Sequence, residues 1–211
     1  MLSLSFRAPI SKFLVRPVAW LARTSLTPDV VTVVGGVGSV TSALVFFPRG
    51  VFFVGTLAVT VFVLLDLLDG QLARAKGSSS VWGAFLDSTL DRVADGAIFA
   101  AIALWYADKG NSTTLAGVAL FCLVSGSVTS YIKARAESLG LTCDVGLAER
   151  AERLIVILAA TGISGLGVPV LLPAALWVLA GLTAITVYQR LAEVHRQAGG
   201  MKRIPLPTKD Q

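Results

Sequence analysis

The sequence predicts an all-α, polytopic membrane protein with six transmembrane helices and one N-terminal amphipathic helix in the membrane interface. Of the 211 residues, 55% are hydrophobic and only 15% are charged, whereas charged residues make up about 25% of an average soluble domain. The apolar residues gather in long runs, and a hydrocarbon core about 30 Å thick takes roughly 20 helical residues per crossing. This composition excludes an ordinary soluble domain, a disordered chain and a disulfide-stapled secreted domain.

The first segment, over about residues 5–24, predicts the interfacial helix. Its apolar residues recur near helical spacing, and the basic residues Arg7, Lys12, Arg16 and Arg23 fall between them. These basic residues interrupt the run too often for the hydrophobic region of a cleaved signal peptide. An amphipathic, basic helix of this kind lies in the interface and does not cross the membrane.

Six apolar runs follow, and together they predict a helical bundle over residues 28–197. The runs are Val30–Pro48, Val51–Leu68, Val81–Tyr106, Thr113–Ile132, Leu154–Leu166 and Val168–Tyr188; the helix of the second continues to about Lys76, and that of the fifth begins near Ala148. Turn-forming residues at 48–50, 109–111 and 165–167 separate the runs. Residues 199–211 are expected to form a flexible cytosolic tail, and residues 1–211 a single membrane domain.

The distribution of basic residues predicts the orientation of these six spans. With the N-terminus in the cytosol, sixteen of the 18 lysine and arginine residues fall on the cytosolic side, and only Arg49 and Lys109 fall on the other. By the positive-inside rule, we expect a multi-pass protein of the cell membrane with both termini in the cytosol. The net charge of +5 favours anionic membrane lipids and acidic substrates as partners, and not nucleic acid.

Four aspartates mark the cytosolic end of two neighbouring spans. Asp66 and Asp69 end the second apolar run, and Asp87 and Asp91 begin the third. Spacings of three and four place each pair on one helix face. Four carboxylates at one depth repel one another and are costly to bury, so we expect bound cations. Interfacial acids paired with arginine would explain one or two of them, but not four at regular spacing.

All-oxygen sites suit hard ions such as Mg²⁺ or Mn²⁺, and no histidine or cysteine cluster favours zinc. Asp95 lies one turn deeper, where a structural hydrogen-bonding role and a catalytic role are both open. The small residues Gly70, Ala73 and Gly83 leave space above the acids for a bulky ligand. Arg74 is placed to contact a phosphate in that space.

The stretch Asp66-x2-Asp69-Gly70-x2-Ala73-Arg74-x8-Gly83-x3-Asp87-x3-Asp91 matches the full signature of the CDP-alcohol phosphotransferase family. The resemblance implies a membrane enzyme, usually a homodimer, that transfers a substituted phosphate from a CDP-linked donor to an alcohol and releases CMP. It also implies two Mg²⁺ or Mn²⁺ ions per site.

The resemblance assigns roles by motif position. It implies metal binding by Asp66, Asp69, Asp87 and Asp91, with Asp91 also as the general base, and a CDP-lipid surface made by Gly70, Ala73, Arg74 and Gly83. In related enzymes the positions of Asp29, Thr32 and Ser80 also approach the nucleotide. Asp29 and Thr32 could equally cap the first span. The lipid tails of such donors favour CDP-diacylglycerol, although the motif does not distinguish it from other CDP-alcohols.

The acceptor must be inferred from other basic residues. Ser130, Lys133, Arg153 and Arg196 are predicted to form a pocket for a phosphate on the acceptor, because arginine forks suit phosphate. Cytosolic loops are basic in any case, and Glu137, Glu149 and Glu152 could pair with these residues locally.

The segment Gly146–Arg153 is similar to family members that use inositol phosphate. Inositol 1-phosphate is therefore the expected acceptor, glycerol 3-phosphate the alternative, and free inositol the third choice. A function of another class, transport of ions or metals, is also compatible with intramembrane acids. The absence of a visible repeat and the cytosolic depth of the acids argue against it.

Overall fold

The computed structural model describes residues 26–77 and 80–200, and this part of the chain contains six helices. They are α2 (Pro28–Phe46), α3 (Phe52–Lys76), α4 (Val81–Ala107), α5 (Thr113–Ser138), α6 (Arg150–Ser164) and α7 (Leu171–Ala198). The described ranges hold no strand, so the all-α prediction is confirmed for them. The interfacial helix expected at about residues 5–24, and nearly all of the tail at 199–211, lie outside the described residues.

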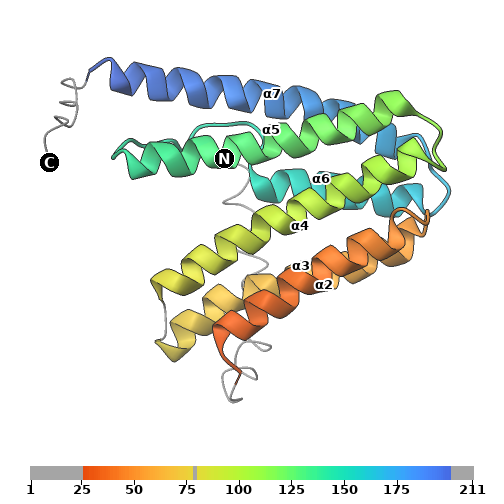
Figure 1. Cartoon of the computed structure of the whole chain (residues 1–211), viewed down its shortest axis with the longest axis horizontal. Helices are drawn as coiled ribbons and strands as arrows, with labels where there is room; N and C mark the ends of the chain where they lie inside the picture. Colours follow the sequence, from red (N-terminus) through yellow and green to blue (C-terminus); the bar gives the residue numbers. More distant parts are fainter. Residues whose placement is uncertain (1–25, 78–79, 201–211) are drawn as a thin grey trace, which may run out of the picture.

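The helices run up and down in a single bundle (Figure 1). Helices α2 and α3 pack as an antiparallel pair, α4 crosses between this pair and α5, and α7 packs on α5 and α6. The connections α2–α3, α4–α5 and α6–α7 lie together at one end of the bundle, on the right of Figure 1. Helices α3, α5 and α7 therefore end, and α2 and α4 begin, toward the opposite end, whereas the short α6 begins part of the way along the bundle (Figure 1).

Each predicted apolar run corresponds to one helix, with differences at the ends. Helix α5 continues past Ile132 to Ser138, and α7 continues past Tyr188 to Ala198. Helix α6 begins at Arg150 because Glu149 and Glu152 form a capping box there. The N-cap of α2 is Thr27, whose side chain accepts a hydrogen bond from the Val30 amide.

Four of the helices, α2, α3, α5 and α7, are long and apolar enough to cross a membrane. The other two differ for distinct reasons. Helix α4 carries several charged side chains in its first half. Helix α6 has only 15 residues, about 22 Å at the helical rise of 1.5 Å per residue, which is less than the hydrocarbon core. The chain is an integral membrane protein. Its described residues contain four helices that are both long enough and apolar enough to span the bilayer.

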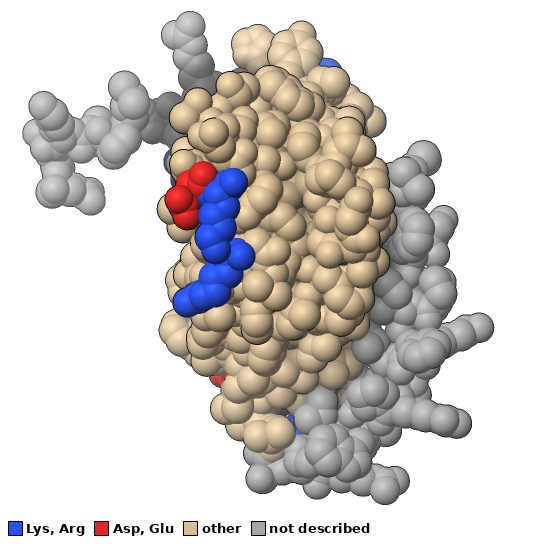
Figure 2. Space-filling view, turned by 90° about the vertical axis from the view of Figure 1, so that its right-hand side faces the viewer, with Lys and Arg blue, Asp and Glu red and all other residues tan. Residues whose placement is uncertain are grey.

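The end of the bundle on the right of Figure 1 is nearly free of charge. Figure 2 views this end; most of its surface is made of uncharged residues, and one group of charged side chains lies toward the left edge. Lys109 belongs to the α4–α5 connection at this end, and its ammonium donates a hydrogen bond to the Arg49 carbonyl (3.2 Å) in the α2–α3 connection. The two basic residues predicted to lie opposite the other sixteen are therefore neighbours.

Glycines on α2 allow it to lie close to α3 and α4. A Cβ atom on Gly35 would lie 3.0 Å from the Cβ of Asp66, and one on Gly36 would lie 3.0 Å from the Cβ of Leu90. A Cβ on Gly38 would overlap the Phe62 ring. Because glycine lacks this atom, the α2 backbone can approach the turn of α3 that carries Asp66.

Candidate active site at the aspartate cluster

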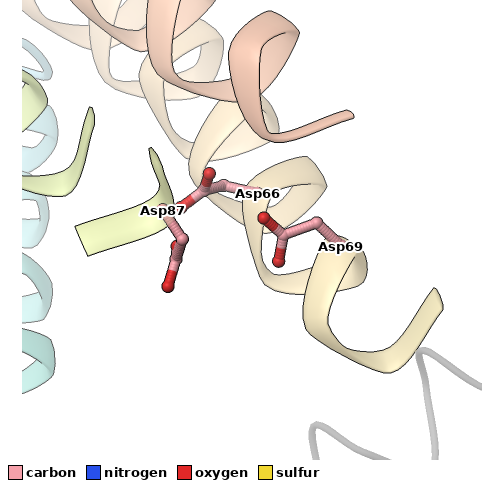
Figure 3. A group of neighbouring side chains, drawn as sticks. All are labelled: Asp66, Asp69 and Asp87. Carbon is pink, nitrogen blue, oxygen red and sulfur yellow. The ribbon is translucent and has the colours of Figure 1, made fainter. Parts of the chain in front are cut away.

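Three carboxylates converge at the end of α3 and the start of α4. Oxygen atoms of Asp66, Asp69 and Asp87 all lie within 4.8 Å of one another. Figure 3 shows Asp66 and Asp69 on neighbouring turns of α3, with Asp87 beside them on α4. The α3–α4 connection is short, so the two helices are antiparallel and bring both halves of the motif to one depth, as the sequence predicts.

Two of the three carboxylates are buried, Asp87 is half-buried, and protein groups satisfy the cluster incompletely. Asp66 is 9% exposed and Asp69 is 8% exposed. The Oδ1 atom of Asp66 is buried without a hydrogen-bond partner. A buried carboxylate oxygen with no donor is unfavourable unless a cation neutralises it. This orphaned oxygen and the all-carboxylate donor set both fit a hard divalent cation.

Asp69 is held by neighbouring donors. The Thr32 hydroxyl of α2 donates a hydrogen bond to its Oδ2, and the Gly70 amide donates one to its Oδ1. Thr32 is buried, and its hydroxyl also lies 3.0 Å from the Pro28 carbonyl. Neither Thr32 nor Asp29 serves as the cap of α2, because Thr27 does so. Thr32 instead links α2 to a carboxylate of the cluster.

Asp91 lies one turn further along α4 and is bound differently. Its carboxylate pairs with the Arg150 guanidinium of α6 at 2.7 Å, and Arg92 approaches it at 3.7 Å. Asp91 is not among the three residues whose oxygens meet within 4.8 Å. The sequence pattern around the motif did not predict the pairing with Arg150, which is remote in the chain. The sequence does contain one indication of this partner: Arg150 and Arg153 are three residues apart and therefore share one face at the start of α6.

Asp95, whose role was open, is part of an ion-pair network. Its Oδ1 lies 3.1 Å from Nε of Arg150, and its Oδ2 lies 3.6 Å from an Arg153 nitrogen. The carboxylate therefore bridges two arginines one turn apart on α6.

The residues expected to line the nucleotide surface lie at the start of α2, the end of α3 and the start of α4. Ser80 caps α4 by accepting a hydrogen bond from the Gly83 amide (2.9 Å). A Cβ on Gly83 would lie 3.1 Å from Oδ1 of Asp29, so the starts of α2 and α4 are close. A Cβ on Gly70 would meet nothing within 4 Å, which leaves open space beside the acids. Ala73 is half-buried and Arg74 is exposed on the last turns of α3.

The four residues of the predicted acceptor pocket are divided in the structure. Lys133 donates a hydrogen bond to Asp144 (2.6 Å) and holds the pKa of that exposed carboxyl below its usual value. Arg153 is only 4% exposed and donates to Thr129 Oγ1 (3.3 Å) and the Ala148 carbonyl (3.1 Å). The Ser130 hydroxyl donates to the Gly126 carbonyl (3.3 Å).

Arg196 lies apart from these three residues. It pairs with Glu193 (3.0 Å from Nε) and, with Gly146 and Tyr188, lines a groove of about 470 Å³. Within the described residues, no ion pair or hydrogen bond joins Arg196 to Ser130, Lys133 or Arg153.

The connection between α5 and α6 is fastened to α7. The Thr186 hydroxyl accepts hydrogen bonds from the Leu147 and Ala148 amides (3.2 and 3.1 Å). The buried Arg190 donates to the Val145 carbonyl (2.9 Å) and to the Thr129 carbonyl (2.6 Å). These contacts fix the segment that leads into Arg150 and Arg153.

The fold and the site together describe an integral membrane protein with a carboxylate cluster that fits a divalent cation. The model of the CDP-alcohol phosphatidyltransferase family matches residues 25–188. The chain belongs to this family and is therefore a transferase, which removes the transporter alternative.

The relatives of this chain include phosphatidylinositol phosphate synthases of several bacteria. The enzyme of Streptomyces avermitilis is 51% identical over 205 residues, which cover 94% of this chain and 84% of the relative. That of Mycobacteroides abscessus is 47% identical over 186 residues, covering 88% of this chain and 84% of the relative.

Solved structures of the Mycobacterium tuberculosis phosphatidylinositol phosphate synthase share the fold. The structure with CDP-DAG bound superposes with a TM-score of 0.87 at 42% identity and covers 92% of this chain and 100% of that chain. The complex with manganese and citrate has a TM-score of 0.87 at 43% identity, with coverage of 93% and 95%.

Proposed function

We propose that this enzyme transfers the phosphatidyl group of CDP-diacylglycerol to a hydroxyl of inositol 1-phosphate, giving phosphatidylinositol phosphate and CMP. The observation that carries the proposal is the buried Asp66–Asp69–Asp87 cluster within a complete family motif. The choice of acceptor is supported by relatives of 47–51% identity that are phosphatidylinositol phosphate synthases.

The proposed cofactor is a pair of Mg²⁺ or Mn²⁺ ions held by Asp66, Asp69, Asp87 and Asp91. The orphaned oxygen of Asp66 supports cation binding, and the manganese complex of the mycobacterial relative is compatible with it. Divalent cations at these carboxylates would supply positive charge against the donor pyrophosphate and the departing CMP.

The protein groups are proposed to bind the substrates and move one proton. Asp91 accepts the proton of the acceptor hydroxyl while that oxygen forms its bond to the donor phosphorus and the bond to CMP breaks. The nucleotide surface comprises Asp29, Thr32, Gly70, Ala73, Arg74, Ser80 and Gly83. The open space at Gly70 and the exposed guanidinium of Arg74 support this assignment.

Ser130, Lys133, Arg153 and Arg196 are proposed to bind the phosphate of the acceptor. Lys133 and Ser130 lie on the last part of α5, and Arg153 lies against Thr129 of the same helix. Lys133 would exchange Asp144, an exposed carboxylate, for the phosphate. Arg196 would have to leave Glu193 and approach from the last turns of α7.

The proposed setting is the cell membrane, with all six helices inserted, both termini and the active site in the cytosol, and two copies forming a homodimer. The nearly uncharged end face in Figure 2 supports this orientation. Residues 5–24 would lie in the cytosolic interface, and residues 199–211 would form a flexible tail.

The deciding experiment is CMP release by the purified protein in nanodiscs with CDP-diacylglycerol and Mg²⁺. Parallel reactions contain inositol 1-phosphate, glycerol 3-phosphate or free inositol. Release only with inositol 1-phosphate is expected. Release with glycerol 3-phosphate instead would keep the transferase chemistry and refute the acceptor, and release with neither phosphate would refute the proposed function.

A further inference from the structure

A series of alternating charges runs from Asp91, one turn beyond Asp87, to the buried Arg153 of α6. Asp91 pairs with Arg150 at 2.7 Å, Arg150 pairs with Asp95 at 3.1 Å, and Asp95 pairs with Arg153 at 3.6 Å. The two carboxylates come from successive turns of α4, and the two guanidinium groups come from successive turns of α6. The series therefore joins α4 to α6 on two successive turns of each helix.

Arg153 is buried, and its ion-pair partner Asp95 and the neighbouring Arg150 are partly buried. The Arg153 side chain is 4% exposed, and those of Asp95 and Arg150 are 15% and 24% exposed. A buried charge that loses its partner is strongly destabilising. Among the described residues, Asp95 is the one carboxylate within ion-pair distance of Arg153. Asp95 is also the group that connects Arg153 to Arg150.

We propose that Asp95 and Arg150 are positioning residues that hold Asp91 and Arg153 at a fixed separation. The inference rests on the proposed function, in which Asp91 accepts the proton and Arg153 binds the acceptor phosphate. Arg150 orients the Asp91 carboxylate, and Asp95 orients both arginines. The acceptor then meets its proton acceptor and its phosphate ligand in one prearranged geometry, which is what proximity effects require.

The proposal predicts different kinetic effects at the two positions. Asp95→Asn removes the charge that orients both arginines, so it raises KM for inositol 1-phosphate about tenfold and also lowers kcat. Arg150→Gln leaves the Asp95–Arg153 pair in place, so it lowers kcat about tenfold and changes KM by less than about twofold. KM for CDP-diacylglycerol stays unchanged in Asp95→Asn.

Metal binding without substrate gives a second readout. Arg150 is a cation that competes for the Asp91 carboxylate, which is also a proposed metal ligand. Its removal in Arg150→Gln should therefore tighten Mn²⁺ binding several-fold, because an unpaired carboxylate attracts a cation more strongly. A residue with a purely structural role would weaken metal binding or leave it unchanged.

The experiment compares wild type with Asp95→Asn, Asp95→Glu, Arg150→Gln and two controls in nanodiscs. The controls are Asp108→Asn, at the opposite end of α4, and Arg135→Gln, whose side chain contacts Ser138. Initial rates of CMP release give kcat and KM, calorimetry gives the Mn²⁺ affinity, and thermal midpoints report folding. Asp95→Glu keeps the charge and should recover most of the acceptor KM, and it replaces Asp95→Asn if that variant does not fold.

The expected result is a KM effect in Asp95→Asn, a kcat effect with tighter Mn²⁺ binding in Arg150→Gln, and wild-type behaviour in both controls. Unchanged constants, or a fall in kcat that only follows the loss of folded protein, would overturn the proposal. If the wild type released no CMP with inositol 1-phosphate, the proposed function would fail by itself. The Mn²⁺ titration of Arg150→Gln would then still decide whether Arg150 controls Asp91.

Discussion

Asp66 and Asp91 illustrate two opposite ways to bury a carboxylate in this protein. Asp66 keeps one oxygen without any donor, so its environment is completed only by something that binds there. Asp91 is already neutralised by Arg150 and Arg92. A cation entering the cluster meets Asp66 as a free ligand and Asp91 as a ligand with a competing arginine.

Substitution of Asp91 by asparagine tests its proposed role as the proton acceptor. The amide cannot accept the proton of the acceptor hydroxyl, so Asp91→Asn should lower kcat by about 100-fold or more. Binding of CDP-diacylglycerol should stay within about threefold of wild type, because three cluster carboxylates remain. Single-turnover CMP release and equilibrium lipid binding measure these two effects, and wild-type turnover would remove Asp91 from this role.

Substitution of Thr32 tests whether its hydrogen bond to Asp69 strengthens metal binding by the cluster. Thr32→Val removes the hydroxyl that donates to Asp69 while preserving side-chain volume. Loss of a hydrogen bond to a metal-ligating carboxylate typically costs about tenfold in metal affinity or more. The Mn²⁺ concentration that half-saturates CMP release should rise accordingly. Thr32→Ser keeps the hydroxyl and should behave nearly as wild type; equal effects of both variants would contradict the assigned contact.

At the scale of elements, α2 determines how closely the cluster can be packed. Gly35 lies against the backbone of Asp66, and Gly36 lies against Leu90, one residue before Asp91. The helix that contributes no member of the cluster therefore touches both helices that do.

A larger side chain at Gly35 should disturb the cluster through α2. Gly35→Val would place its Cβ 3.0 Å from Asp66, forcing α2 away from α3 at a cost of about 1–3 kcal/mol. We expect a lower thermal midpoint together with weaker Mn²⁺ binding. Gly117→Ala is the matched control, since a Cβ there meets nothing within 4 Å and alanine favours the helix by about 0.5–1 kcal/mol. A Gly35→Val protein with wild-type Mn²⁺ affinity would show that α2 does not support Asp66.

Hydrophobic runs predicted the existence of all six described helices, because each run is long and its turn residues are distinct. They predicted the ends less well. Ser138 and Ala198 end helices whose last turns are polar, beyond the apolar segment that defines the run. The Asp66–Asp69–Asp87 grouping was also predictable, since it needs only helical spacing and one short connection. The Arg150–Asp91 pair was not, because it depends on where the tertiary fold places the start of α6, which no local pattern encodes.

At the scale of the whole molecule, the placement of charge predicts which end faces the cytosol. Lys109→Cys, in the α4–α5 connection, should react with a membrane-impermeant maleimide in intact cells. Glu137→Cys, near the end of α5, should react only after permeabilisation. The natural cysteines Cys122 and Cys143 are both buried, so the wild-type protein serves as the background. Labelling of Glu137→Cys in intact cells would reverse the proposed orientation.

Helix α4 carries Asp87, Asp91 and Asp95 at intervals of one turn. The rise of the α-helix fixes their spacing along the axis at about 6 Å per step and about 12 Å in total. Under the proposed roles, α4 sets the distance between the donor end of the site and Arg153, which binds the acceptor phosphate. In an acceptor of another length, the hydroxyl and the phosphate would not reach Asp91 and Arg153 at the same time. The size of alcohol that the enzyme accepts would then depend on the spacing of the acids on α4. Changing this specificity would require moving an acid by one helical turn.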